Sequence, residues 1–208
     1  MPSDPQLALG VVILAAGKSS RMGSPKLLLP WSGTTVLGHL IHTWSQLPAS
    51  QIVVVHEENN DILAELERLQ FPFENRVQNP QPQRGMFSSV QCAAKWKGWK
   101  PELSHWAITL GDQPQLKLGT LQALAAFAQK QPEEICQPSY RGRPKHPVIF
   151  SKKEFRILID SMANNLKDFL ASRSNAVRLI ELDDAGLDFD LDTPSDYETA
   201  LKHFRSLN

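Results

Sequence analysis

Three basic residues cluster in a short loop of small residues near the N-terminus. Lys18, Arg21 and Lys26 lie within nine positions, after the apolar run Val11–Leu14. That run is typical of a buried strand, and it stops at Gly17. Small residues let backbone N–H groups approach an anion, and basic side chains neutralise it. The loop therefore predicts a polyphosphate site at the end of a first strand.

The loop does not match the two commonest phosphate-binding motifs. The segment Gly17-Lys18-Ser19 resembles the tail of a P-loop, but Val12 stands where that motif needs glycine. Pro25 and the run Leu27–Pro30 favour extended chain beyond the loop, whereas a P-loop lysine begins a helix. The dinucleotide fingerprint fails because Ser19 occupies its second glycine position. A plain connection between two elements is the alternative interpretation, and the three basic residues argue against it.

A carboxylate follows a second apolar run. Asp112, in Gly111-Asp112-Gln113-Pro114, comes directly after the expected strand Trp106–Leu110. If the two strands are parallel neighbours, Asp112 lies on the same rim of the sheet as the opening loop. A hard divalent cation that bridges phosphates needs such a ligand. The alternative is a structural turn that Pro114 closes.

Three more acids lie near the C-terminus. Asp188, Asp190 and Asp192 alternate with apolar residues, so an extended segment would point all three carboxylates to one face. Clustered acids repel one another unless a cation or a basic group compensates them. We expect at least one of the trio to bind metal together with Asp112. Asp192 can also be interpreted as the residue that enters the last helix.

Two weaker candidates lie between these motifs. Ser88 and Ser89 stand near the start of an expected helix, where they would donate hydrogen bonds to a nucleotide or only cap the helix. His146, beside Lys145, would contact phosphate or substrate, although a lone histidine is more often structural or on the surface.

The elements that must position these residues alternate along the chain. Segments with helical apolar spacing separate the strand-like runs, which predicts βαβ units and an α/β fold with a mainly parallel central sheet flanked by helices. The turn Arg141–Pro147 enters a strand that we expect to be antiparallel, in the C-terminal half. Thr193 is the expected N-cap of a last helix with Pro194 in its first position. The expected strands are Val11–Leu14, Ile52–Val55, Trp106–Leu110, Pro147–Phe150 and Val177–Leu182.

Length and composition limit the class of protein. The 208 residues fit one domain, residues 1–208, that can bury a sizeable core. The 22 basic and 22 acidic residues balance, which argues against nucleic acid or membrane partners. Cys92 and Cys136 have no metal or redox spacing and are expected to be small buried residues in a reducing compartment. No signal-peptide pattern and no long apolar run is present, so we expect a cytoplasmic protein.

Taken in order, these motifs resemble one family over nearly the whole chain. The chain is similar to the MobA-like nucleotidyltransferases, and most to the molybdenum cofactor cytidylyltransferases. The most specific element is Leu14–Gly23 with Lys26, and it marks the superfamily. The segments that favour the cytidylyl branch are His146-Pro147 and Asp190–Pro194, and the remaining matches are Leu29-Pro30-Trp31, Thr35-Val36-Leu37, Asn79-Pro80 through Gly85 to Ser89, and Gly111–Pro114.

This resemblance implies a Rossmann-like nucleotidyltransferase fold and a role for each matching residue. Arg21 and Lys26 would be catalytic, holding phosphates and stabilising the departing pyrophosphate. Asp112 would bind Mg²⁺ with Asp190 or Asp192, and Gln113, Lys145 and His146 would face the second substrate. The nucleotide would contact Leu14, Ala15, Ala16, Gly17, Arg21, Lys26, Ser88, Ser89 and Gly111.

The implied reaction is transfer of CMP from CTP to the terminal phosphate of a pterin cofactor, with release of pyrophosphate. The Ala-Ala-Gly turn at positions 15–17 favours CTP over GTP. A molybdoenzyme that receives the cofactor is the implied partner. Gln113 replaces the methionine that the family usually carries after this aspartate. Two alternatives follow, namely a relative with another nucleotide or another phosphate acceptor, and a cofactor-binding maturation chaperone without turnover.

Overall fold

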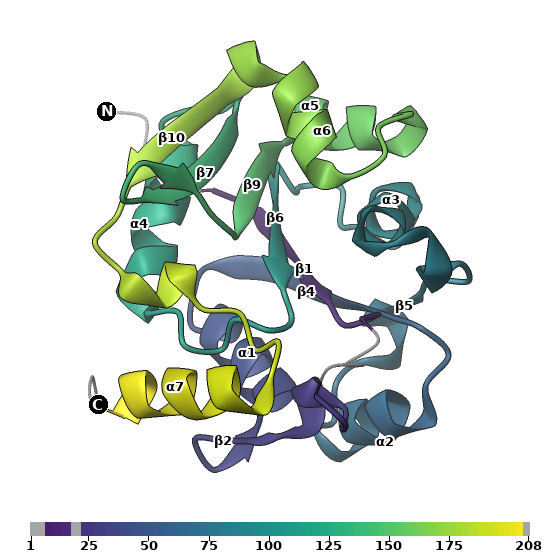
Figure 1. The fold of residues 1–208 in the computed structure, drawn as a ribbon. Helices are drawn as coiled ribbons and strands as arrows, with labels where there is room; N and C mark the ends of the chain where they lie inside the picture. The colour runs from purple at the N-terminus through teal and green to yellow at the C-terminus, as the bar shows by residue number, and fades with distance from the viewer. Residues whose placement is uncertain (1–6, 18–21, 206–208) are drawn as a thin grey trace.

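A single mixed sheet forms the centre of the molecule. A computed structural model of the chain describes residues 7–17 and 22–205. Seven strands lie side by side in the order β10-β7-β9-β6-β1-β4-β5, and β8 pairs with β7 at one end (Figure 1). A separate two-stranded ribbon, β2-β3, lies after the first loop. The strands are β1 Leu9–Leu14, β2 Pro30–Trp31, β3 Thr34–Thr35, β4 Ala49–His56, β5 Arg76–Gln78, β6 His105–Leu110, β7 Ile135–Tyr140, β8 Arg143–Pro144, β9 Val148–Ser151 and β10 Val177–Glu181.

Parallel pairing dominates this sheet, as the sequence predicts. Strand β1 is parallel to both β4 and β6, β4 to β5, and β10 to β7. Strand β9 is antiparallel to β6 and to β7, so the antiparallel part lies in the C-terminal half. The expected α/β fold class is confirmed, including its antiparallel portion.

Helices cover both faces of the sheet and bury two apolar cores (Figure 1). One core lies under α1, α2, α4 and α7 and contains Trp44, Leu66, Leu124 and Ala200. The other lies under α3, α5 and α6 and contains Val90, Phe155 and Phe169. The α-helices are α1 Val36–Ser45, α2 Asn60–Arg68, α3 Met86–Lys95, α4 Leu118–Gln129, α5 Lys152–Ile157, α6 Leu166–Ser172 and α7 Pro194–Arg205.

Short 3-10 turns connect several of these elements, and one of them corrects the sequence analysis. Lys26–Leu28 forms such a turn, not the extended chain expected from Pro25 and the Leu27–Pro30 run, although the chain does extend again at β2. The Leu28 and Leu29 N–H groups bond back to the carbonyls of Pro25 and Lys26. The remaining turns are Phe73–Asn75, Pro82–Arg84, Leu158–Asp160, Ser174–Ala176 and Ala185–Asp188.

The order of the strands fixes where a ligand can bind. The chain runs from β1 outward to β4 and β5, and then returns to the other side of β1 at β6. In open parallel sheets such a change of direction leaves a crevice at the carboxyl ends of the strands. Here the loops that follow β1 and β6 border that crevice.

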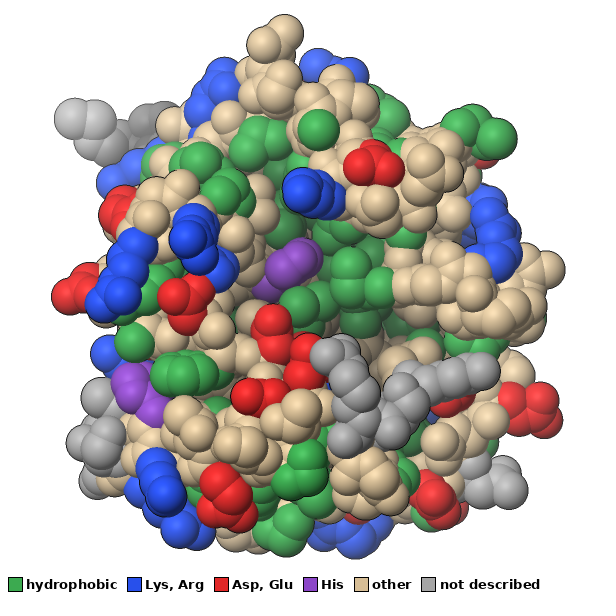
Figure 2. Space-filling view, in the orientation of Figure 1, with side chains coloured by type: hydrophobic (Ala, Val, Ile, Leu, Met, Phe, Trp, Pro, Cys, Tyr) green, Lys and Arg blue, Asp and Glu red, His purple; other side chains and the backbone are tan. Residues whose placement is uncertain are grey.

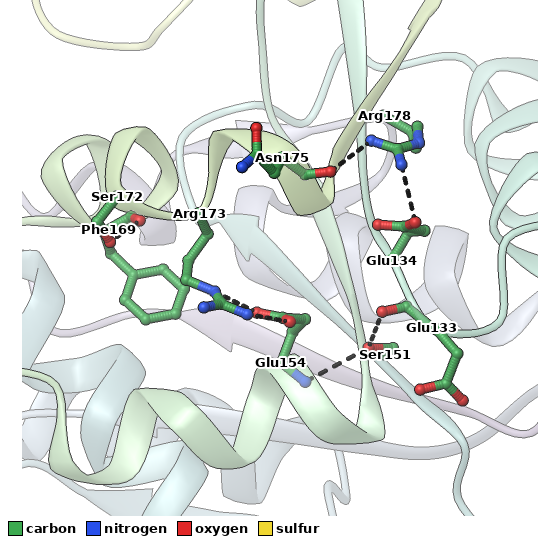
Figure 3. A network of polar contacts seen from close by, with 9 residues as sticks. All are labelled: Glu133, Glu134, Ser151, Glu154, Phe169, Ser172, Arg173, Asn175 and Arg178. Carbon is green, nitrogen blue, oxygen red and sulfur yellow. Dashed lines mark hydrogen bonds and ion pairs between the residues drawn. The ribbon is translucent and has the colours of Figure 1, made fainter.

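An ion pair between the buried Glu154 and the partly exposed Arg173 ties α5 to the end of α6. Arg173 donates two hydrogen bonds to the Glu154 carboxylate, from Nε to Oε2 at 2.8 Å and from Nη2 to Oε1 at 2.6 Å (Figure 3). Ser151 caps α5 by accepting from the Glu154 N–H at 3.3 Å, and its hydroxyl donates to the carbonyl of Glu133. Beside this pair, Arg178 of β10 donates to Glu134 at 2.9 Å. These bonds hold α5, α6, β9 and β10 together at one end of the sheet.

Within residues 7–17 and 22–205, every helix is too short or too polar to cross a lipid bilayer.

Candidate nucleotide-binding site

The ends of β1 and β6 lie side by side at the centre of the rim. Leu14 of β1 is the register partner of Leu110 of β6, so the loop at Ala15–Gly17 lies next to Gly111 and Asp112. A Cβ atom on Gly111 would lie 2.5 Å from the Leu14 carbonyl oxygen. Only glycine fits this close approach between the two loops. The register therefore places Asp112 beside the basic loop, as the sequence predicts.

A cleft of about 520 Å³ opens at this point. It brings together seven of the predicted site residues, namely Leu14, Ala16, Gly17, Lys26, Ser89, Gly111 and Asp112. Ala15 and Ser88 are buried and do not line it. Arg21, predicted to be catalytic, belongs to residues 18–21, which lie outside the described residues.

The opposite wall of the cleft is a segment that sequence reasoning did not single out as ligand-binding. Pro82, Gln83, Gly85 and Met86 line the cleft just before and at the start of α3. Gly85 has φ +85°, which favours glycine, and a Cβ there would meet no heavy atom within 4 Å. The first N–H groups of a helix attract anions, so this wall faces the cleft with a partial positive charge. Gly85 beside Pro82 was the signal available in the sequence.

The two candidate serines divide into different roles. The Asn79 amide donates to both hydroxyls, at 2.8 Å to Ser88 and 2.9 Å to Ser89. The Ser88 hydroxyl donates to the Gly85 carbonyl at 2.7 Å and so closes the turn before α3. Ser89 alone lines the cleft. Ser88 therefore has a structural role, although it does not cap α3, because its hydroxyl donates to a carbonyl and the N-cap position is Gly85. Ser89 is placed to contact a ligand.

Charged groups of both signs meet at the base of the cleft. The Lys26 ammonium group donates to Asp112 Oδ2 at 2.6 Å and lies 3.6 Å from Asp192 Oδ1. The other carboxylate oxygen of Asp112, Oδ1, is buried and has no hydrogen-bond partner among the described residues. Lys26 thus balances two acids that lie 80 positions apart in the sequence.

Asp190 belongs to the same group of acids. Gln113 donates to Asp190 Oδ1 at 2.8 Å and is itself buried. Partial loss of hydration, followed by the negative charge of Asp112, raises the pKa of the Asp190 carboxyl group. The Leu191 N–H donates to the Asp112 carbonyl at 3.1 Å, which holds the C-terminal acidic segment against the loop after β6.

Asp188 lies apart from this group. It sits at the end of the 3-10 turn Ala185–Asp188, and its carboxylate pairs with Lys145. The prediction of one shared face for all three C-terminal acids is therefore wrong, because the turn rotates Asp188 away from the extended segment that follows. Lys145, expected to face substrate, is occupied by this ion pair.

His146 is partly buried at the side of the same region. Burial lowers the pKa of its imidazole to about 4, against the attraction of Asp112, so the ring is neutral at pH 7. Its Nδ1 atom is buried and has no hydrogen-bond partner among the described residues. A buried polar atom without a partner is uncommon in proteins and requires an explanation.

Residues 7–17 and 22–205 contain no group of three or more His, Cys, Asp or Glu side chains already arranged around one point as metal ligands. The unpartnered Asp112 Oδ1 and the raised pKa of Asp190 still fit a divalent cation, because both mark negative charge that is incompletely compensated.

The cleft lies at the ends of two parallel strands, is bordered by glycines and has a lysine and carboxylates at its base. These features suit the binding of a nucleoside triphosphate and a divalent cation. The sequence profile described as MobA-like NTP transferase domain matches residues 11–177. The chain belongs to this family. It is a nucleotidyltransferase.

Individual curated proteins match almost the whole chain. The molybdenum cofactor cytidylyltransferase of Escherichia coli is 27% identical over 206 residues, which cover 96% of this chain and 99% of that protein. The purine catabolism protein PucB of Bacillus subtilis is 30% identical over 203 residues, which cover 90% of this chain and 93% of PucB.

A solved structure shows the same similarity. Rv0371c of Mycobacterium tuberculosis superposes with a TM-score of 0.74 and is 27% identical, covering 94% of this chain and 98% of that one. The same protein was also solved in complex with manganese, with a TM-score of 0.68 and 25% identity over the same shares of both chains.

Proposed function

We propose that this enzyme transfers CMP from CTP to the terminal phosphate of molybdopterin or the molybdenum cofactor and releases pyrophosphate. The observation that carries the proposal is the contact between Lys26 and Asp112 at the base of a cleft formed by the first loop and the start of α3. Similarity over the whole chain to a molybdenum cofactor cytidylyltransferase supports the choice of nucleotide and acceptor.

The residues of the cleft supply position and charge. A phosphate nucleophile is already ionised near neutral pH, so the reaction needs no general base. Lys26 would hold the triphosphate and offset the negative charge that grows on the departing pyrophosphate. Gly17 and Gly85 leave room for the phosphates, since a Cβ at either position would point into open space among the described residues. Arg21 is proposed to assist Lys26.

Asp112 would hold Mg²⁺ together with Asp190 or Asp192. The bound ion would supply neutralisation of the triphosphate oxygens. To let these acids bind a cation, Lys26 must turn from Asp112 toward the phosphates, and the approach of a triphosphate favours that movement. The relative solved with manganese supports a divalent ion in this family.

Two further outcomes stay open beside this proposal. One alternative is a related transferase that uses another acceptor or another nucleotide such as GTP. Similarity to PucB, which is named a purine catabolism protein, favours this alternative. The hydrogen bond from Gln113 to Asp190 occupies one oxygen of a proposed metal ligand, which is the observation that favours a cofactor-binding chaperone without turnover. A molybdoenzyme is the proposed recipient of the finished cofactor in either case.

Pyrophosphate release separates these functions. The purified enzyme is supplied with Mg²⁺ and with CTP, GTP, ATP or UTP in turn, with and without molybdopterin. We expect release from CTP only when molybdopterin is present. Preference for another nucleotide would show that the protein is a related transferase with a different nucleotide substrate. Molybdopterin binding without pyrophosphate release from any nucleotide would identify a chaperone.

A further inference from the structure

A second large groove shares a loop with the nucleotide cleft. It has a volume of about 810 Å³ and is bordered by α1, the β2–β3 turn, the start of α4 and the end of α7. The loop between β6 and α4 contributes to both cavities, because Gly111 and Asp112 line the cleft and Gln115, Leu116 and Lys117 line the groove. One short segment therefore belongs to the walls of two separate cavities.

The groove carries positive and hydrogen-bonding groups. Its described lining includes the exposed Lys117 and His42, and it includes no carboxylate. Acidic side chains gather instead near the centre of the face shown in Figure 2. The Lys117 ammonium group lies 3.9 Å from Asp184 Oδ1, which is too long for a hydrogen bond, so this lysine can bind the phosphate of a ligand. Three hydroxyl groups also border the groove, those of Ser32, Thr34 and Thr43.

Another part of the groove wall is apolar. Leu69 and Leu118 line it together with the ring of Phe204. His39 packs edge-on against Phe204, with the ring centroids 5.2 Å apart. An apolar wall and a cationic wall in one groove of this volume suit a ligand of mononucleotide size, with a flat ring at one end and a phosphate at the other.

Gln115 connects this groove to the acids of the proposed metal site. It is only 1% exposed, and its amide nitrogen donates to the carbonyls of Gly186 at 2.8 Å and Phe189 at 2.7 Å. Phe189 directly precedes Asp190, so these two bonds hold the acidic segment in place. The amide oxygen of Gln115, Oε1, is buried and has no hydrogen-bond partner among the described residues. A buried acceptor without a partner is costly, and a donor on a ligand would remove that cost.

His39 makes a second connection from the groove to the same loop. Burial, followed by the nearby His42, lowers the pKa of the His39 imidazole, and its hydrogen bond with the Pro114 backbone acts against them. Pro114 directly follows Gln113, which donates to Asp190 at 2.8 Å. Two side chains of the groove wall therefore contact the backbone that positions this acid.

We propose that this groove is a second ligand site, which binds an organic phosphate of mononucleotide size and is coupled to the nucleotide cleft through the loop between β6 and α4. The phosphate of the ligand pairs with Lys117, its ring packs against Phe204, and an N–H group on the ring donates to Gln115 Oε1. The bound ligand fixes Gln115 and thereby the segment that carries Asp190, so the cleft binds its nucleotide more tightly. By linkage, a nucleotide in the cleft tightens binding in the groove by the same factor. The site does not depend on which acceptor the enzyme uses.

AMP is a suitable probe, because it has a phosphate and a purine ring that carries N–H groups. Its binding is measured by titration calorimetry with and without saturating CTP and Mg²⁺, and the acceptor is left out so that no turnover occurs. Since CTP fills the cleft, AMP that still binds occupies another site. Ribose 5-phosphate, which lacks the ring, and adenosine, which lacks the phosphate, are measured in parallel.

Two neighbouring exposed residues at the end of α1 provide matched variants. Gln46 lines the groove, whereas Ser45 does not. Gln46→Trp fills the groove from its edge, and Ser45→Trp adds the same ring outside it. Lys117→Ala removes the partner of the phosphate, and Lys117→Arg keeps a positive charge there. Unchanged affinity for CTP shows that each variant is folded, and AMP binding to Gln46→Trp without CTP measures any AMP that enters the cleft.

We expect the wild type to bind AMP in the presence of CTP, and CTP should raise the affinity of the groove for AMP about fivefold. Gln46→Trp and Lys117→Ala should weaken this binding at least about tenfold, because each removes a contact or the space for it. Ser45→Trp and Lys117→Arg should stay within about twofold of the wild type. Ribose 5-phosphate and adenosine should each bind at least about tenfold more weakly than AMP.

AMP binding that disappears when CTP fills the cleft, or that Gln46→Trp leaves unchanged, would overturn the second site. Groove binding that does not respond to CTP would overturn its coupling to the cleft. These measurements need no turnover. Failure of pyrophosphate release in the presence of molybdopterin would instead reject the proposed reaction and would leave the AMP results as they stand.

Discussion

Lys26 is the side chain on which the proposed chemistry depends most. Its ammonium group contacts Asp112 and lies near Asp192 at the base of the cleft, where all three side chains are partly exposed to water. Lys26→Ala should lower kcat for pyrophosphate release by about 10²–10³, the usual cost of losing one charge-stabilising group. The fold should persist, because the acids left behind are partly hydrated.

The readout for Lys26→Ala is kcat beside a urea unfolding midpoint. Lys152→Ala is the matched control, since Lys152 is exposed and its amine donates to the Pro101 carbonyl, away from the cleft. Near-normal CMP transfer by Lys26→Ala would contradict the proposed catalytic role of Lys26 and, with it, the proposed function.

Asp112 should set the metal dependence. Asp112→Asn keeps the shape of the side chain but removes the charge that the proposed Mg²⁺ site needs. The Mg²⁺ concentration for half-maximal activity should rise by about 10–100-fold, as for other changes around metal sites. A titration of activity against Mg²⁺ measures this, with the exposed Asp183→Asn as control. An unchanged midpoint would place the metal elsewhere.

At the residue scale, the sequence predicts which loops come together at the site. It predicts the directions of individual side chains less well. The spacing in the first loop and the position of Asp112 after a strand place both on one rim, because parallel strands end together. The separation of Ser88 from Ser89 depends on the turn at Gly85, and the direction of Asp188 on a 3-10 turn. Neither turn has a periodic pattern in the sequence.

At the scale of elements, β7 shows why some strands escape prediction. It runs through Ile135–Tyr140 and contains Pro138, which cannot donate to a neighbouring strand and argues against a central strand. Strand β7 nevertheless lies between β9 and β10. The Pro138 carbonyl still accepts from the Lys145 N–H at 2.8 Å, and Pro138 pairs in register with Ile180 of β10. Burial on both faces of the sheet overrides the local preference.

The ion pair between Arg173 and Glu154 should be the most sensitive polar contact between elements. The Glu154 side chain is only 1% exposed, so Arg173→Met would leave a buried carboxylate without its partner. We expect a loss of about 3–5 kcal/mol in the free energy of unfolding, measured by urea titration. The double variant Arg173→Met/Glu154→Met should lose clearly less, because no buried charge remains. Equal losses would show that packing, not charge, holds α5 to α6.

For the whole molecule, the alternation of strand and helical patterns is enough to predict a layered α/β fold. Apolar strands such as β1 are buried on both faces, and helices with apolar stripes cover them. The order of the strands is harder to predict from the sequence. After β4 has paired with one edge of β1, the chain returns and β6 pairs with the other edge, and no local pattern specifies this choice. That return is what creates the cleft.

The stability of the whole molecule should fall as the pH falls from about 6.5 to 4. Burial lowers the pKa of His105 to about 4, so the folded protein keeps this ring neutral while the unfolded chain protonates near 6.5. Stability from this group is fully present above pH 6.5 and is lost by pH 4, with a size on the order of 2–4 kcal/mol.

Urea midpoints measured between pH 4 and 7 test this slope. His105→Gln should flatten it, and the exposed His42→Gln on α1 should keep the slope of the wild type. The pH assignment to His105 is rejected if both variants follow the wild type. His146 should add to the same slope, since burial holds its pKa at about 4 as well.

The most direct test of the central proposal follows the transferred group itself. The enzyme is incubated with Mg²⁺, molybdopterin and CTP labelled at the α-phosphorus, or with equally labelled GTP, and the pterin product is isolated and weighed by mass spectrometry. The proposal predicts that label from CTP appears on the pterin as a CMP adduct in step with pyrophosphate release, and that Lys26→Ala forms almost none. Label that stays on the nucleotide, or that reaches the pterin only from GTP, would contradict it.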